Sequence, residues 1–122
     1  RHDALPTGAL GAAARVGEVS SRADERECGS RHAGLARHAR RLLGADRLDA
    51  TVVDLDPGQG SEPYHYVYGR EEWLLVLAGT PALRHPQGED QLEAGDLVCF
   101  PEGPAGAHRV VNRGESDVRA MS

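Results

Sequence analysis

The sequence contains no lysine and no isoleucine, and Asn112 is its only asparagine. Without lysine the chain has no amine for a Schiff base and cannot form a phosphate-binding P-loop, so both chemistries are excluded. Positive charge therefore comes from arginine alone, apart from histidine and the amino terminus.

Long apolar runs are also missing. No stretch approaches the roughly 20 apolar residues that a membrane-spanning helix needs, so no membrane partner is expected. Residues 1–17 show no continuous apolar block of the kind found in a secretory signal peptide. We therefore expect a cytoplasmic location.

Cysteine is scarce. Cys28 and Cys99 lie far apart and outside any CxxC pattern, which excludes a zinc knuckle and a disulfide framework. We expect both to be free thiols.

Charge is distributed unevenly along the chain, whose formal net charge is -5. Residues 31–47 carry five arginines against one acid, whereas residues 48–102 carry eleven acids against two arginines. The basic segment has no aromatic side chain that could stack on a base, and the protein as a whole is acidic, so nucleic acid is not favoured as a partner. We expect the segment to be a solvated face, or to pack on the acidic part of its own or a neighbouring chain.

A chain of 122 residues predicts one domain. Residues 1–29 show no sustained periodicity and are expected to form an irregular or partly disordered lead-in to a single domain at 30–122. Apolar positions within 30–43 suit a short amphipathic helix with Ser30 as its cap, and the same segment could instead form an edge strand.

From residue 48 onward, short apolar runs alternate with turn residues, a pattern typical of an all-β sandwich or barrel. No helical pattern interrupts these runs, which argues against a parallel βαβ architecture. The expected antiparallel strands are 48–55, 64–68, 72–78, 82–85, 90–92, 97–100, 108–111 and 117–120.

Three polar residues stand out against this background. His65 and Glu72 lie on consecutive expected strands, and His108 lies on a much later one. Strand alternation places Val67 on the same face as His65. A carboxylate that enters an apolar interior needs a partner, and two imidazoles holding a divalent cation would supply it. His65, Glu72 and His108 are therefore candidate ligands for iron, manganese, zinc, nickel or copper.

Alternation on the next strand also bears on the choice of carboxylate. Glu72 shares a face with Leu74, Val76 and Ala78, which makes it a better ligand candidate than the adjacent Glu71, the alternative ligand. It remains open whether the two histidines bind a metal or merely pack near Glu72. The expected lining of the interior pocket is Val67, Leu74 and Val76.

The spacing of these residues resembles the two motifs of the cupin superfamily, and in particular small single-domain bacterial cupins. The resemblance implies an antiparallel double-stranded β-helix, or jelly-roll barrel, that takes a small-molecule ligand or substrate and assembles as a homodimer. The first motif matches Gly60, His65-Tyr66-Val67, Glu72 and Gly79, and the second matches Gly95-Asp96, Pro101-Glu102-Gly103, His108 and Asn112.

One position departs from the family pattern. Metal-binding cupins have a second histidine in the first motif, and Val67 stands there in this chain. The remaining two-histidine, one-carboxylate set resembles a facial triad with open positions and should hold a metal more weakly. Two functions remain open: a metal-dependent enzyme acting on a small molecule, with no nameable general base, and a non-catalytic ligand-binding or sensor protein with a degenerate site.

Other polar and aromatic residues are expected to be structural or superficial. Asp96 and Asn112 should bond to neighbouring backbone groups. The aromatic residues expected on the outer surface, where they could form a dimer contact, are Tyr64, Tyr66, Tyr68 and Trp73.

Overall fold

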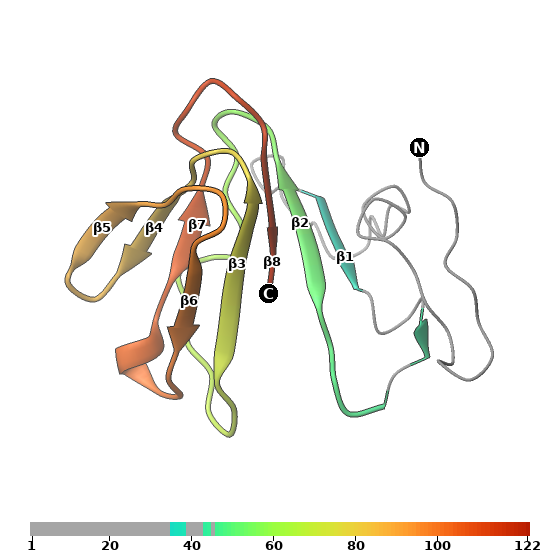
Figure 1. Ribbon diagram of the computed structural model, residues 1–122. Helices are drawn as coiled ribbons and strands as arrows, with labels where there is room; N and C mark the ends of the chain where they lie inside the picture. The colour runs from blue at the N-terminus through green and yellow to red at the C-terminus, as the bar shows by residue number, and fades with distance from the viewer. Residues whose placement is uncertain (1–34, 39–42, 45) are drawn as a thin grey trace.

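The structure is a computed structural model that describes residues 35–38, 43–44 and 46–122 (Figure 1). Eight strands and one short 3-10 helix make up its regular elements in this part of the chain. They are β1 Leu35–His38, β2 Thr51–Leu55, β3 Glu72–Ala78, β4 Ala82–His85, β5 Gly88–Gln91, β6 Leu97–Phe100, η2 Pro104–Gly106, β7 Arg109–Val111 and β8 Val118–Met121.

The strands form two antiparallel sheets, which confirms the predicted all-β fold. One sheet has five strands in the order β1-β2-β8-β3-β6, and the other has three in the order β5-β4-β7. In Figure 1, β4, β5 and β7 group on one side of the molecule, and β1 and β2 lie on the other. Within the described ranges, the chain has no helix that is long and apolar enough to cross a membrane.

The hydrophobic core draws on both sheets. On β3, alternate residues Leu74 and Val76 are 4% and 1% exposed, as expected for a strand with one face turned inward. Burial of such side chains is the main favourable term in folding. The other members of the cluster are Leu55, Leu83, Leu92, Phe100, Val110, Val118 and Ala120.

Most predicted strands are present, with ends shifted by no more than a few residues, but the strand predicted at 64–68 is wrong. That segment makes only an isolated bridge, between His65 and His108. Pro63 has no N–H to donate to a ladder just before it. Farther along, the Val67 carbonyl accepts a hydrogen bond from Gly103 in a loop. The segment therefore leaves the sheet after a single bridge.

The segment 30–43 is described only in part. Residues 35–38 form the edge strand β1, paired with β2, so the edge-strand alternative is confirmed there and the helix is wrong over these four residues. The predicted lead-in at 1–29, the Ser30 cap and Cys28 lie outside the described residues.

The structure gives a structural role to two of the motif residues, Gly79 and Asn112. Gly79 has φ +84°, and a Cβ at this position would collide with the Asp117 carbonyl, so no other residue fits without strain. Asn112 is 1% exposed. Its amide donates to the carbonyls of Leu55 at 3.0 Å and Ser116 at 2.7 Å. The predicted structural role of Asn112 is confirmed.

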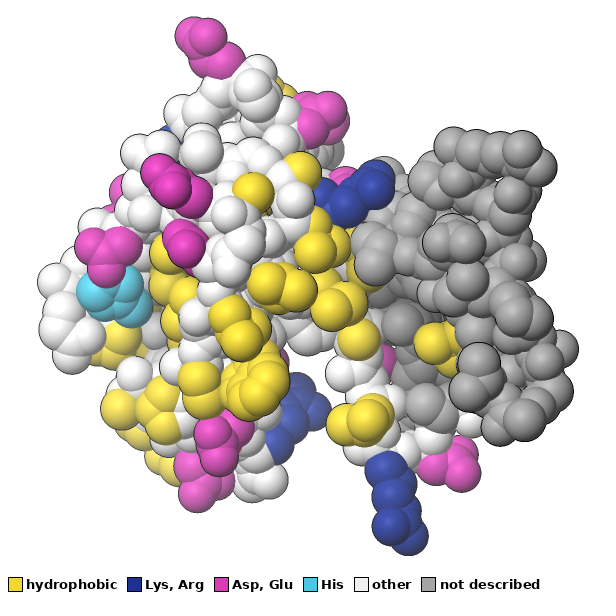
Figure 2. All heavy atoms as spheres, viewed as in Figure 1, with side chains coloured by type: hydrophobic (Ala, Val, Ile, Leu, Met, Phe, Trp, Pro, Cys, Tyr) yellow, Lys and Arg dark blue, Asp and Glu magenta, His cyan; other side chains and the backbone are white. Residues whose placement is uncertain are grey.

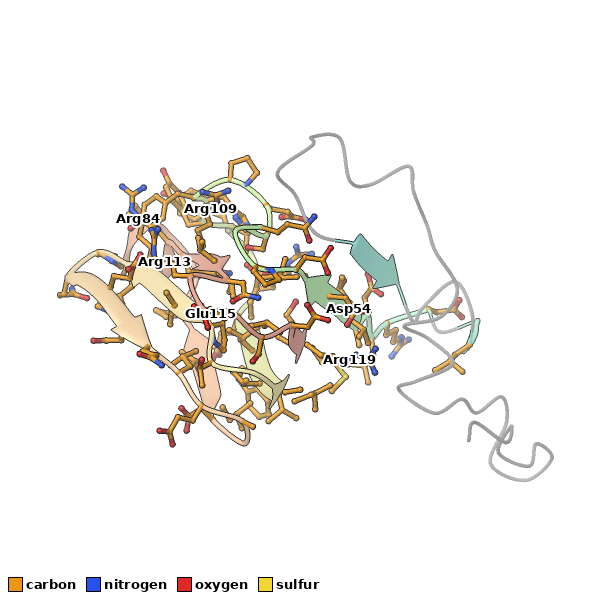
Figure 3. All side chains as sticks on the ribbon, turned by 90° about the horizontal axis from the view of Figure 1, so that it is seen from above. Asp54, Arg84, Arg109, Arg113, Glu115 and Arg119 are labelled. Atoms are coloured by element: carbon orange, nitrogen blue, oxygen red, sulfur yellow. The ribbon has the colours of Figure 1, made fainter. Side chains whose placement is uncertain are left out.

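Asp96 also behaves as predicted, since its carboxylate accepts a hydrogen bond from the Glu93 amide at 2.8 Å. On the outer side of the larger sheet, Asp54 and Arg119 are register partners of β2 and β8 and form an ion pair at 2.7 Å. Figure 3 shows these two side chains pointing toward one another.

Candidate metal centre

His108 stands immediately before β7 and is 8% exposed. Its Nδ1 lies 2.7 Å from the Gly106 carbonyl. A carbonyl can only accept, so Nδ1 carries the hydrogen and Nε2 keeps its lone pair. The ring stacks on Phe100, with centroids 3.6 Å apart and planes at 9°. His108 is thus a buried, oriented donor.

His65 lies on the irregular segment between β2 and β3, and its side chain is 31% exposed. Backbone hydrogen bonds at 3.2 and 2.9 Å connect it to His108 in both directions. Its Nδ1 lies 2.8 Å from the Pro63 carbonyl, which again leaves Nε2 with the free lone pair. In both histidines, a backbone carbonyl two residues upstream accepts a hydrogen bond from Nδ1 and so leaves Nε2 available as a ligand.

Glu72 completes the group. It begins β3, where it pairs in register with Phe100, and its Oε1 lies 4.0 Å from His65 Nε2. The ligand atoms of His65, Glu72 and His108 all lie within 4.8 Å of one another. Donors bound at about 2.0–2.2 Å to one ion in tetrahedral geometry lie about 3.4 Å apart. The three side chains would therefore have to close on one another by up to about 1.4 Å to share a metal.

The electrostatics of this group suit a cation. Burial lowers the pKa of His108, although the hydrogen bond to Gly106 and the negative charge of Glu72 act in the opposite direction. The imidazole is therefore neutral near pH 7, which is the form that binds metals. The charges that act on His108 include the carboxylates of Glu72 and Glu62. A divalent cation would be attracted rather than repelled.

The other predicted site residues lie in different surroundings. Leu74 and Val76 belong to the core cluster, and Val67 is half-buried but is not among the hydrophobic residues packed against that cluster. Ala78 is exposed, because the register of β3 shifts between Val76 and Ala78. The predicted shared face of β3 therefore ends at Val76.

The alternative ligand Glu71 lies apart from the two histidines' group. Its carboxylate accepts a hydrogen bond from the Cys99 thiol at 3.3 Å, and this contact raises the pKa of Cys99. Cys99 is an exposed free thiol, as predicted. Its register partner Trp73 is also exposed, which places this corner on the outer side of the sheet.

Glu62 lies close to this group, although no sequence motif pointed to it. Its Oε2 lies 3.4 Å from His65 Nε2. On the strand predicted at 64–68, extension back to Glu62 would put residues 62 and 65 on opposite faces. The chain bends on both sides of Pro63, which brings the two side chains together instead. The usable signal was the proline itself, which argues against a regular strand at this point.

Comparisons with known proteins agree with this architecture. The sequence profile of the family described as cupin domain matches residues 51–122, which hold all three candidate ligands. No curated protein matches the chain closely enough to count as a relative.

Three solved structures illustrate the similarity. A sugar phosphate isomerase from a cupin superfamily, from Silicibacter pomeroyi, is 28% identical with a TM-score of 0.68, over 71% of this chain and 55% of that one. A candidate sugar phosphate isomerase from Acidithiobacillus ferrooxidans is 24% identical with a TM-score of 0.66, over 72% and 57%. A predicted oxalate decarboxylase from Thermotoga maritima is 19% identical with a TM-score of 0.60, over 71% and 75%.

The matched region spans little more than half the length of the Silicibacter and Acidithiobacillus proteins. The two lower identities bear on the fold alone. The family match covers more than half of the chain and includes both motifs, and the two antiparallel sheets have the expected form. This chain belongs to the cupin superfamily.

Proposed function

We propose that this protein binds a divalent transition metal through His65, Glu72 and His108 and acts with it on a small molecule. One observation carries the proposal: three ligand atoms converge within 4.8 Å, while the Nδ1 atoms of both histidines are held by backbone carbonyls. Histidines that merely pack do not need ligand atoms this close to a shared carboxylate.

Each side chain has a distinct role in this site. His108 supplies the fixed donor, His65 supplies a second imidazole from a more exposed position, and Glu72 neutralises part of the ion's charge. A bound divalent ion with open positions would polarise a carbonyl or hydroxyl oxygen of the substrate. Three protein donors leave such positions open.

The class of substrate is suggested by one similar structure, that of the 28% identical protein named a sugar phosphate isomerase. Small hydroxy-carbonyl compounds, with sugar phosphates first, are therefore the substrates to test. An isomerase would produce the partner aldose or ketose without any added oxidant.

A second function is a non-catalytic one, in which the protein binds a small metabolite as a sensor or binding module. Val67 favours it, because an apolar side chain replaces a histidine of the family pattern and weakens the expected hold on a metal. The two functions separate cleanly. The enzyme converts a substrate in the presence of metal, and the binding module shifts its melting temperature with a ligand that it leaves unchanged.

The metal site is tested by isothermal titration calorimetry of tag-free protein with Zn²⁺ and Mn²⁺. We expect one ion per chain for the wild type and no measurable binding for His108→Ala. His85→Ala is the matched control, since His85 pairs with Asp90 at 2.8 Å elsewhere, and it should bind like wild type. If wild type and His108→Ala bind equally, or neither binds, the proposal fails.

We also propose a homodimer formed through the outer face of the larger sheet. Trp73 and Leu97 are 61% and 57% exposed. They lie on adjacent strands with Cys99 and Leu75 as their register partners. Figure 2 shows hydrophobic side chains gathered over β3 and its neighbours on the viewed face.

The cytoplasmic location expected from the sequence stays a prediction.

The tyrosines that the sequence analysis grouped with Trp73 fit this interface less well. Tyr64 packs under the Arg84 guanidinium at 4.4 Å, and Tyr66 contacts Tyr68 edge to face. Trp73→Glu should therefore convert a dimer to a monomer in sedimentation velocity, and Tyr66→Glu should not. A wild-type monomer at tens of micromolar would remove the dimer from the account.

A further inference from the structure

We infer that Glu62 is a fourth, movable metal ligand that compensates for the imidazole absent at Val67. The inference rests on the proposed function of the His65, Glu72 and His108 group. It assigns a second carboxylate to a site in which the family resemblance implies only one.

The Glu62 carboxylate lies beside the ring nitrogen of His65 that is left to bind a metal. His65 Nε2 lies between two acids, 3.4 Å from Glu62 Oε2 and 4.0 Å from Glu72 Oε1. The nearer of the two is Glu62. Since His65 Nδ1 is already occupied by the Pro63 carbonyl, Nε2 is the atom that would bind the metal, and Glu62 already faces it.

The backbone around Glu62 is anchored, whereas its side chain is exposed and touches only one side of the site, at His65. The preceding residue, Ser61, donates its amide to the Val110 carbonyl at 2.7 Å and accepts the Val110 amide on its hydroxyl at 3.0 Å. His65 is fixed to His108 on the other side. The Glu62 side chain itself is 72% exposed. An anchored backbone with an exposed carboxylate suits a ligand that closes on an ion.

A second carboxylate would also balance the charge of a divalent ion in this site. A divalent ion held by Glu72 and two neutral imidazoles keeps one uncompensated positive charge, and a second carboxylate cancels it. Glu62 lies outside the group whose atoms are all within 4.8 Å, so it must rotate inward to bind.

The test is Glu62→Gln, which keeps the shape and removes the charge, with Glu115→Gln as the control for loss of one exposed acid. Glu115 is exposed on the loop between β7 and β8. Calorimetry with Mn²⁺ and Zn²⁺ should show affinity lowered roughly ten-fold or more by Glu62→Gln, in the range known for lost metal-site partners. Glu115→Gln should stay within about two-fold of wild type.

Two further readings separate a ligand from a distant charge. The loss should persist in 0.5 M salt, where the interaction of exposed, separated charges is screened. The visible spectrum of the Co²⁺-loaded protein should also differ between wild type and Glu62→Gln, because the donor set differs. If wild type binds metal and Glu62→Gln binds it equally, or the loss vanishes in salt with an unchanged spectrum, Glu62 is no ligand although the three-residue site stands. If wild type binds no metal, the proposed function itself falls.

Discussion

The two histidines of the candidate centre are held in contrasting ways. His108 is buried, stacks on Phe100 and leads directly into β7. His65 is partly exposed and lies on a segment that makes a single bridge to the sheet. The first half of the site is fixed by packing, whereas the second is fixed mainly by hydrogen bonds to the backbone of His108 and Pro63.

This difference indicates which residues of such a site can be substituted without loss of the fold. The buried half tolerates few substitutions, since a new side chain there must fit a close-packed interior. The exposed half can lose or gain a ligand at small cost to folding. Val67, the departure from the family pattern, and Glu62, the nearby carboxylate, both belong to the exposed half. The predictions below test that asymmetry.

The largest expected effect is a loss of stability when a side chain of the buried half is truncated. Phe100→Ala should lower the free energy of unfolding by about 3–5 kcal/mol, the range for truncation of a buried aromatic ring. It should also weaken metal binding, because His108 loses the ring against which it stacks. Tyr66→Ala, on the exposed half, should cost less than about 1 kcal/mol. Urea unfolding measures both, and similar costs for the two variants would break the comparison.

The second effect is on how the free energy of unfolding depends on pH. Burial lowers the pKa of His108 in the folded state, whereas the unfolded value is about 6.5. The folded protein therefore binds this proton less readily than the unfolded chain. The free energy of unfolding is unaffected by His108 above pH 6.5 and falls as the pH drops below it, by at most about 1.4 kcal/mol per pH unit.

His108→Gln removes this titration. Urea unfolding of metal-free protein between pH 5 and 8 should show wild type losing stability toward acid more steeply than His108→Gln. Parallel curves for the two proteins would show that the imidazole is as accessible to protons as in the unfolded chain.

A third prediction concerns the exposed half. Val67→His restores the residue of the family pattern and should tighten metal binding by roughly ten-fold, equivalent to about 1.4 kcal/mol. The Val67 backbone is held by the hydrogen bond from Gly103 at 2.7 Å, so the change affects mainly the side chain. Metal should raise the melting temperature of this variant more than that of wild type. Equal shifts would mean that residue 67 does not face the ligands.

The smallest expected effect is at Glu71. Its carboxylate is paired with the Cys99 thiol, so Glu71→Gln should change metal affinity by less than about two-fold. Calorimetry beside Glu72→Gln makes this a matched pair of adjacent acids. A larger loss from Glu71→Gln than from Glu72→Gln would restore Glu71 as the ligand.

Much of the fold could be predicted from sequence, because burial enforces alternation on the strands. β3, β4 and β6 begin and end where their apolar patterns do. The failure at 64–68 has a local cause. Its alternation of tyrosine with other residues imitates a strand, but no strand in the described part of the chain pairs with it beyond His65, and pairing is not encoded in a period of two.

The candidate site was predictable in part for the same reason. Motif spacing brought His65, Glu72 and His108 to attention, and these residues do come together. Glu62 was missed because its approach to His65 depends on a bend around Pro63 that the predicted strand excluded, although the proline itself argues against a regular strand there. Likewise, the stack of His108 on Phe100 depends on how the end of β6 packs against the start of β7, which belongs to the other sheet.

The most direct test of the account is a crystal structure of tag-free protein grown with Zn²⁺ or Mn²⁺, with the ion located by its anomalous scattering. The account predicts one strong peak per chain, bonded to Nε2 of His65, Nε2 of His108 and the carboxylate of Glu72, at about 2.0–2.2 Å. A peak only at other residues, or none at this group under millimolar metal, would contradict it.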